Sequence, residues 1–366
     1  MNNKKICLFL IIFLCISGFF FAEDQLKLTF VGDIMAHDVN FQMKDYSKIY
    51  EKVKHYFQAD DLTFGNLETP INNDLPYSTY PSFNVKEPYV QAAVNAGFDV
   101  FSLANNHAND KGDIGVLKTL TALMVLKDRV QGNLYFSGVR GNTSKPFTPE
   151  VIYKNGYKIG FLAVTQFLNA PQSTPYVHMV EYHNKTAAKQ FLDELKKITP
   201  DYDVFIVSFH ADVEYVQTPD PVKQMFFRDL ANAGVHIIWG HHPHVLQPYE
   251  TIDVNGARHL IMYSAGNFIS GQTYGLTPDR ATSARALTGD SAIFRVEISK
   301  NTQGKASISN VTPVFISVYK TPENDTIVDT LESLSVSKLP GKWQDFYKSR
   351  LRIIIAFFNT MEKYLH

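Results

Sequence analysis

Cysteine is scarce in this chain of 366 residues, and its two cysteines, Cys7 and Cys15, both lie within the first 22 residues. Beyond residue 22 the chain can therefore form neither a disulfide framework nor a thiolate metal site. A metal ion bound there would have to be held by the oxygen and nitrogen donors of Asp, Glu, Asn and His side chains.

An excess of charge of one sign is also missing. The 35 basic and 36 acidic side chains leave a formal net charge of −1, and no basic stripe is present, so the sequence predicts no nucleic-acid partner. With 45% hydrophobic residues and many aromatics, the chain can bury a large core. No repeat or low-complexity linker divides it, which favours a single main domain.

The first 22 residues are typical of a secretory signal. Lys4 and Lys5 precede a run without charges from Ile6 to Phe21, and Ala22 is followed by acidic residues, so cleavage after Ala22 is expected. Phe20 is a poor match to the small residue that such a site prefers, and the alternative is an uncleaved membrane anchor. Either way we expect export to the periplasm or cell envelope. No later stretch is long and apolar enough to span a bilayer.

Strand-like and helix-like segments alternate along most of the chain. Strands are predicted at 26–31, 62–64, 100–104, 159–164, 204–208, 235–239 and 259–264, and helices at 46–58, 88–96, 115–126, 186–198 and 221–233. This alternation predicts an α/β fold. Beyond Asp290 the pattern indicates strands at 292–298 and 311–319, and an amphipathic helix at 343–365 that favours packing on the domain over a membrane. We therefore expect a signal at 1–22, a domain at 23–330 and a helical extension at 331–366.

Three histidines within four positions follow one of these strands. His241, His242 and His244 come after the apolar run Ile237–Gly240, which reads as a buried strand ending in a turn. Three imidazoles so close repel one another when protonated, so the cluster favours a bound cation. The alternative is a solvated His-rich loop, and the choice depends on whether other strand ends supply partners.

Other strand ends carry polar residues as well. Asp33 follows the first strand and is either a helix cap or a carboxylate ligand, while Glu68 is either a surface acid or a ligand. His210 taken alone is equally well explained as a hydrogen-bonded core residue. Asn106 and His107 are harder to explain by packing: Asn is a neutral oxygen ligand, and an adjacent His can protonate a leaving group if Asp110 holds its other nitrogen.

Taken together, these donors predict a binuclear metal centre. The set consists of Asp33, Glu68, Asn106, His210, His242 and His244. Two divalent ions that share such ligands clamp a substrate oxyanion and activate water. The sequence has no Gly-x-Ser-x-Gly elbow, no P-loop and no His-Glu-x-x-His helix, so other catalytic templates fit less well.

The segments FVGDIM, GNLETPI, ANNHANDKG, SFHADVEY, GHHPHVLQ and SAGNF resemble, in this order, the poly-γ-glutamate capsule biosynthesis (CapA-like) family of the calcineurin-like metallophosphoesterase superfamily. The resemblance extends from Leu28 to Phe268. It implies a four-layer α-β-β-α sandwich with the site at the strand ends. It also implies Asp33 as a first-motif ligand, Glu68 as a bridging acid, and Asn106 as a ligand beside the general acid His107, with His210, His242 and His244 completing the set.

The chain departs from the family pattern in two places. The superfamily usually has His two residues after the first Asp, where this chain has Met35, and His37 is a possible substitute. The family's His-Trp-Gly-x-Glu motif is replaced by His210-Ala211-Asp212-Val213-Glu214, which adds Asp212 as a possible ligand.

The resulting functional expectation has two forms. The first is an exported hydrolase that uses two ions of Mn, Zn or Fe to cleave a phosphoester or a poly-γ-glutamate amide bond in capsule or envelope synthesis, together with envelope-localised partners. The second is a non-catalytic envelope protein that binds or exports an anionic polymer.

Overall fold

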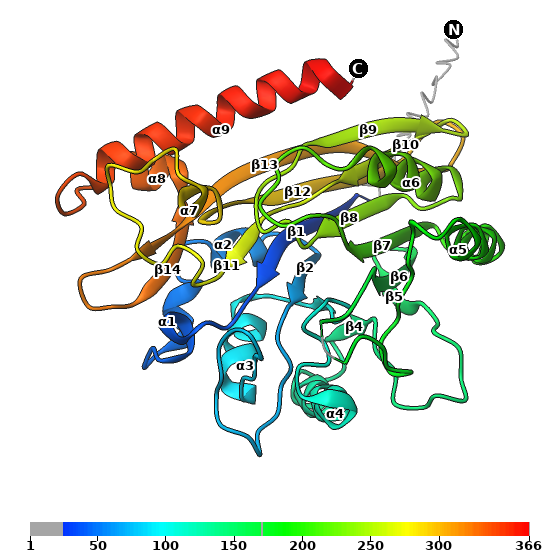
Figure 1. The fold of residues 1–366 in the computed structure, drawn as a ribbon. Coiled ribbons are helices and arrows are strands. Elements are labelled where there is room, and N and C mark those ends of the chain that lie inside the picture. Colours follow the sequence, from blue (N-terminus) through cyan, green and yellow to red (C-terminus); the bar gives the residue numbers. More distant parts are fainter. Residues whose placement is uncertain (1–24, 170, 366) are drawn as a thin grey trace, which may run out of the picture.

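The computed structural model describes residues 25–169 and 171–365. The predicted signal at 1–22 lies outside this described part of the chain. The described residues form a mixed α/β fold built on two sheets (Figure 1).

The first sheet has the strand order β14-β13-β12-β1-β2-β3-β4, with β11 paired to β1. Its strands are β1 (Leu26–Ile34), β2 (Leu62–Leu67), β3 (Val100–Ser102), β4 (Tyr135–Ser137), β11 (Asn267–Ile269), β12 (Asp290–Lys300), β13 (Ala306–Lys320) and β14 (Thr326–Thr330). The second sheet has the order β5-β6-β7-β8-β10-β9. Its strands are β5 (Glu150–Lys154), β6 (Tyr157–Thr165), β7 (Val204–His210), β8 (Ile237–His241), β9 (Tyr249–Val254) and β10 (Ala257–Met262).

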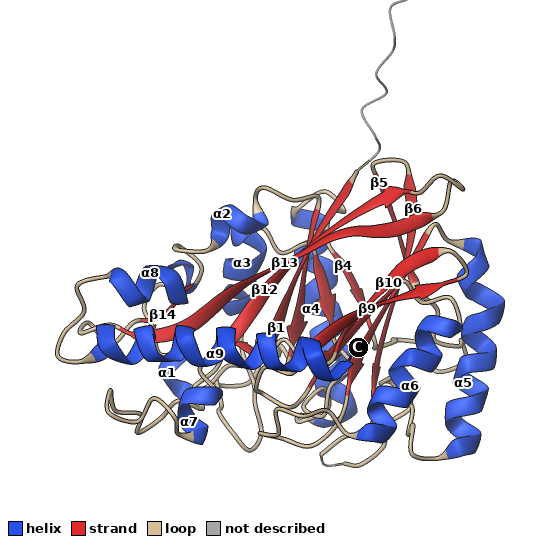
Figure 2. Ribbon diagram, turned by 90° about the horizontal axis from the view of Figure 1, so that it is seen from above, coloured by secondary structure: helices blue, strands red, loops and turns tan. Residues whose placement is uncertain are grey.

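Helices cover the outer faces of both sheets. α3 (Glu87–Ala96) and α4 (Gly112–Arg129) pack on the first sheet, and α5 (Lys185–Ile198) and α6 (Pro221–Asn232) pack on the second (Figure 2). The inner faces meet in a shared core. The fold is therefore the α-β-β-α sandwich that the sequence predicted.

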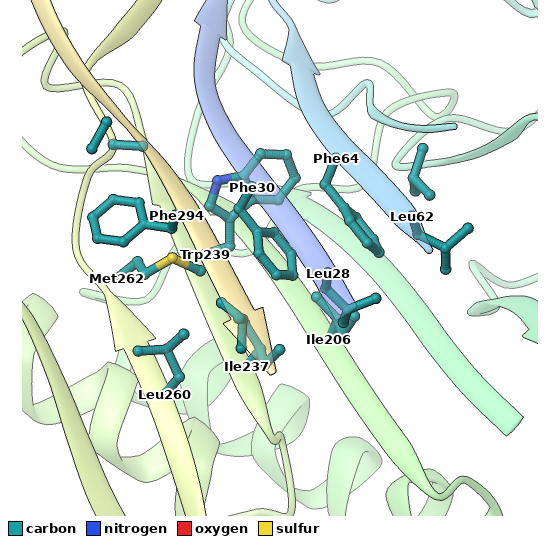
Figure 3. Packing of buried hydrophobic residues seen from close by; sticks show 14 of the residues in the cluster. Leu28, Phe30, Leu62, Phe64, Ile206, Ile237, Trp239, Leu260, Met262 and Phe294 are labelled. Carbon is teal, nitrogen blue, oxygen red and sulfur yellow. The ribbon is translucent and has the colours of Figure 1, made fainter. Parts of the chain in front are cut away.

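Aromatic side chains from both sheets fill the space between them (Figure 3). Phe30 of β1 stacks on Phe64 of β2 with ring centroids 4.6 Å apart, and Trp239 of β8 contacts Phe30 edge-on at 5.5 Å. Polar contacts also cross from sheet to sheet, among them Trp239 Nε1 donating to the Val31 carbonyl (3.0 Å) and Ser208 Oγ donating to Ser102 Oγ (2.8 Å). The two sheets are thus held at a defined relative position just below their strand ends.

The prediction of a continuous helix at 46–58 is wrong. Residues Tyr46–Ile49 form a 3-10 turn (η1), and Lys54–Phe57 form a single helical turn (α2). The apolar spacing still marks the buried face, because Ile49, Val53 and Phe57 are all buried. The segment contains several aromatic and β-branched residues of modest helix propensity, so packing decides its path. The pattern also missed β4, β5, β9, β11 and β14, and the short helices α1 (Asp38–Phe41), α7 (Ala284–Leu287) and α8 (Leu331–Val336).

The C-terminal helix α9 (Trp343–Leu365) lies across β12 and β13 in both views (Figures 1 and 2). Phe346, Tyr347 and Ile354 are buried against the inter-sheet core. Arg350 is also buried and forms an ion pair with Asp290 of β12, with Nη2 and Nε 2.5 and 2.6 Å from Oδ2. Within the described residues, no helix combines the length and the apolar character needed to cross a bilayer.

Replacing Asp60 with Asn is expected to raise the free energy of unfolding by roughly 1–3 kcal/mol at pH 8. Burial at the amino end of β2 raises the pKa of Asp60 to about 7 from 3.8. A raised folded-state pKa gives stability that is present below pH 4 and is lost as the pH rises through about 7. Urea unfolding at several pH values would therefore show a gain for the variant that shrinks toward pH 4, whereas the exposed Asp128→Asn control should show none.

Candidate metal centre

Parallel strands from both sheets deliver the candidate ligands to one edge. Asp33 lies near the end of β1, Glu68 follows β2, and His210 ends β7. His242 and His244 follow β8, and Asn106 follows β3. Gly32 permits this convergence, because a Cβ there would lie 1.8 Å from the Gly266 carbonyl oxygen. The backbones at residues 32 and 266 are therefore closer than any side chain at residue 32 would allow.

The donor atoms fall into two groups that share one residue. Glu68, His242 and His244 form one group, and Asp33, Glu68 and His210 form the other; within each, one donor atom per residue lies within 4.8 Å of the others. All five side chains are buried. Glu68 is therefore the one residue that the two groups have in common.

Backbone conformation aims the last two histidines. His242 and His244 have φ of 94° and 55°, values that non-glycine residues adopt at a cost. The centroids of the two rings lie 5.7 Å apart. Such backbone strain persists mainly at functional sites. Its presence at both residues is consistent with the two imidazoles binding one ligand.

The two carboxylates respond oppositely to the same buried surroundings. Burial acts to raise the pKa of Asp33, but hydrogen bonds and charge from His241 and His244 outweigh burial and hold that pKa well below its usual value. Burial, and then repulsion from Asp33, raises the pKa of Glu68 well above its usual value. Neither carboxylate has a salt bridge to Lys or Arg in the described part of the chain. A cation would supply the missing positive charge.

Two of the site histidines, His210 and His242, are held in the form that binds metal. Burial, followed by repulsion from neighbouring imidazoles, lowers the pKa of His210 and of His242 well below 6.5. Neutral imidazole is the ligand form. Glu68 Oε1 and His242 Nδ1 are buried and, among the described residues, have no hydrogen-bond partner. Glu68 Oε1 lies 3.7 Å from His210 Nε2 and 3.8 Å from His244 Nε2, too far for hydrogen bonds. These donors fit divalent ions.

Asparagines surround the ligands. The side-chain Oδ1 of Asn106 lies 2.8 Å from His210 Nε2. Asn66 Nδ2 donates to Asp33 Oδ1 (2.8 Å) and lies 3.3 Å from His210 Nδ1. Asn267 Oδ1 lies 3.0 Å from His244 Nδ1. Asn66 lies in the GNLETPI segment and Asn267 in the SAGNF segment, but neither was among the predicted ligands.

His107 and Asp110 form a pair at the edge of the centre. His107 Nδ1 lies 2.7 Å from Asp110 Oδ2, which also accepts the Phe83 backbone N–H. Asn169 Nδ2 lies 3.4 Å from His107 Nε2 and its Oδ1 accepts from Asn106 Nδ2. Asn169 lies in a loop after β6 and carries no motif, so nothing in the sequence signalled it.

The two residues left open by the sequence lie outside both donor groups. His37 packs edge-on against Phe83 at 5.1 Å, and burial, then repulsion from His244, lowers its pKa to about 4. Asp212 Oδ2 contacts the buried Lys223 ammonium at 3.3 Å and accepts from Gln247 Nε2. His241, beside the ligand histidines, has Nδ1 3.2 Å from Asp33 Oδ1.

The chain is similar to known capsule biosynthesis proteins. The model of the family described as "Bacterial capsule synthesis protein PGA_cap" matches residues 27–272. The chain is 28% identical over 308 residues to the PGA biosynthesis protein CapA of Bacillus subtilis strain 168, covering 81% of this chain and 73% of that protein. It is 28% identical over 273 residues to the capsule biosynthesis protein CapA of Bacillus anthracis, covering 71% of this chain and 63% of that protein.

Among solved structures, the NAD nucleotidase NadN of Haemophilus influenzae matches with a TM-score of 0.47 and 12% identity, over 90% of this chain and 62% of that one.

Proposed function

The chain belongs to the bacterial capsule synthesis protein PGA_cap family, and on this premise we propose that it is an exported, metal-dependent hydrolase acting in capsule or cell-envelope polymer synthesis. The substrate bond is a phosphoester or an amide of an anionic polymer, and envelope-localised synthesis proteins are its partners. The observation that carries the proposal is the position of Glu68, which is common to both groups of donor atoms.

Six side chains would hold two ions of Mn, Zn or Fe: Asp33, Glu68, Asn106, His210, His242 and His244. When bound, such a pair supplies Lewis-acid polarisation of the substrate and an activated water. The protein contributes the neutral imidazoles, and Asn66 and Asn267 orient Asp33 and His244. Partners of this kind commonly tune metal affinity by 10–100-fold.

His107 acts as the general acid. The Asp110 carboxylate accepts a hydrogen bond from Nδ1–H of the doubly protonated ring, and the proton on Nε2 is the one donated to the leaving group. The rings of Phe83 and Tyr80 lie edge-on to the His107 ring, with centroid distances of 4.6 and 6.4 Å, and limit its rotation. Asn169 lies beside Nε2 and can orient the leaving group at the same point.

Replacing Asp110 with Asn is expected to lower kcat by about 100-fold while metal content and KM stay near wild type. The neutral amide no longer stabilises the positive charge of the doubly protonated ring that donates the proton. Steady-state kinetics and elemental analysis would measure both effects, with the exposed Asp128→Asn variant as the control. A loss of bound metal in Asp110→Asn would place Asp110 in the metal shell instead.

The hydrolase proposal is tested on purified protein. Elemental analysis should find close to two transition-metal ions per chain. Activity with Mn²⁺, Zn²⁺ or Fe²⁺ should then be found against phosphomonoesters, phosphodiesters or poly-γ-glutamate, and should be lost in His242→Ala. Protein without bound metal, whose properties do not change in His242→Ala, would contradict the proposal. Cell fractionation tests export.

A non-catalytic polymer-binding protein is the second candidate. The observation that favours it is the buried Met35, which occupies the position two residues after Asp33 and cannot ligate as His does. In this case Asp33→Ala and His107→Ala would leave function in cells intact, and the purified variants would still bind the polymer.

A further inference from the structure

Lys223 places a buried ammonium group at the start of α6. The residue is 0% exposed, and lysine is almost never fully buried unless it is paired. Its Nζ lies 3.1 Å from Gln247 Oε1, 3.3 Å from the Ala211 carbonyl oxygen and 3.3 Å from Asp212 Oδ2. Burial lowers the pKa of Lys223 to about 8, against the charge of Asp212. The ammonium is therefore still mostly protonated at pH 7, and its three N–H groups match three acceptors.

The three acceptors come from the two segments that carry the ligand histidines. Two of the acceptors directly follow His210 at the end of β7, and Gln247 follows His244 in the segment after β8. Gln247 also joins the two segments itself, because its Nε2 donates to Asp212 Oδ2 at 3.2 Å. His210 and His244 belong to different groups of donor atoms. The Lys223 ammonium therefore connects the segment that carries one group to the segment that carries the other.

This connection lies where the sheet no longer holds the two segments together. The pairing of β7 with β8 ends at His210 and His241, and His244 follows beyond it on a turn with φ of 55°. One backbone bond links the segments further on, from the Tyr215 N–H to the Pro243 carbonyl at 2.8 Å. Side-chain contacts between the segments therefore contribute to the position of His244 relative to His210.

Asp212 adopts a strained backbone conformation to make its contacts. Its φ is 101°, which glycine adopts freely and aspartate only at a cost. In this conformation its carboxylate contacts Lys223 and also accepts from the backbone N–H groups of Val213 (2.8 Å) and Asp220 (3.3 Å). Strain of this kind persists mainly at functional sites. Its presence two residues after a ligand histidine is consistent with a contact that serves the metal centre.

We propose that Lys223 is a positioning residue of the metal centre, which fixes the two groups of donor atoms relative to each other. This inference rests on the proposed function, because it assigns a role within the same binuclear site. The ammonium and a metal ion are both positive, so the charge of Lys223 opposes ion binding. Lys223 supports metal binding through geometry, and this contribution outweighs the repulsion.

Calorimetric titration of the full-length protein with Mn²⁺, after removal of bound metal, tests the proposal without requiring turnover. Asp212→Gly combined with Lys223→Met removes the ion pair as a unit, so no buried charge is left alone, and glycine accepts the φ of residue 212. We expect this double variant to bind Mn²⁺ about tenfold more weakly than wild type, as for other residues that orient metal ligands. Equal or tighter binding would mean that Lys223 only balances the charge of Asp212, and would overturn the proposal.

Gln247→Met breaks the same connection from its other end and keeps the ion pair. Methionine fills a similar volume but offers neither an acceptor to Lys223 nor a donor to Asp212. We expect the affinity for Mn²⁺ to fall about three- to tenfold. Gln190→Met and Lys197→Met, two exposed substitutions on α5, should match wild type.

Thermal unfolding of the metal-free proteins separates a positioning role from loss of the fold. The expected result is weaker Mn²⁺ binding in variants that unfold cooperatively and near the wild-type Tm. If the double variant does not fold, Gln247→Met decides, because it leaves the buried charges paired. If wild type binds Mn²⁺ and the folded variants bind it equally well, the inference is wrong and the proposed function stands. If wild type binds no divalent metal, both are wrong.

Discussion

Glu68→Gln is expected to abolish tight binding of both ions and to lower hydrolysis by roughly a thousandfold. Glu68 is the residue shared by the two donor groups, so its loss affects both ions, whereas loss of His242 or Asp33 affects one group directly. Elemental analysis after dialysis and the initial rate at saturating Mn²⁺ measure the two effects. The exposed Glu51→Gln variant should retain wild-type values.

Thermal unfolding distinguishes this loss from misfolding. In the metal-free protein the Glu68 carboxylate is buried and repelled by Asp33, so Glu68→Gln should unfold at the same temperature as wild type or higher. Added Mn²⁺ should raise the Tm of wild type by mass action and leave the variant unchanged. A variant that is less stable without metal, yet gains stability with it, would contradict the assignment of Glu68 as the shared ligand.

Arg350→Met is expected to cost about 3–5 kcal/mol of unfolding free energy, the largest stability effect that we expect from a single substitution. Arg350 and Asp290 are only 1% and 2% exposed, and the substitution leaves the Asp290 carboxylate buried without its cation. Arg350 Nη1 also donates to the Ala281 carbonyl at 2.7 Å. Urea unfolding measures the loss, and Arg352→Met on the exposed face of α9 is the matched control.

A double-mutant cycle identifies the cause. Asp290→Asn keeps a side-chain acceptor for Ser317 Oγ, whose bond to Oδ1 is 2.8 Å in the native protein, and removes the buried charge. Combined with Arg350→Met, it should lose at least about 2 kcal/mol less than the sum of the single losses. Additive losses would mean that Arg350 acts independently of Asp290, through packing and its bond to the Ala281 carbonyl.

The sequence was sufficient for the strands that carry the site and for the main donor residues. Strands that are parallel end at one edge, so polar residues directly after apolar runs, such as Asp33, Glu68 and His210, were expected to meet there, and the structure brings them together. The sequence was not sufficient where position depends on packing between distant segments. Asn169 reaches His107 from a loop 62 residues away, and no periodicity or motif encodes that approach.

Local composition also could not separate competing roles for similar side chains. Asp212 and Glu214 are two residues apart and both follow His210. Lys223, on a helix that was predicted correctly, is buried and holds Asp212, whereas Glu214 is exposed. Because buried lysine is rare, an ammonium at this position could not be predicted from the residue pattern. The same limit applies to the segment 46–58, whose buried positions were evident although its backbone was not.

The polar contacts between the sheets have a thermodynamic consequence. Asp33 and Glu68 are carried by the first sheet, and His210, His242 and His244 by the second. Ions that bind all of them are bound only when the sheets are docked, so metal affinity and sheet docking are linked equilibria. Trp239→Phe, which deletes the donor to Val31, should therefore weaken metal binding although every ligand is unchanged. The measured metal affinity would then report the stability of the contact between the two sheets.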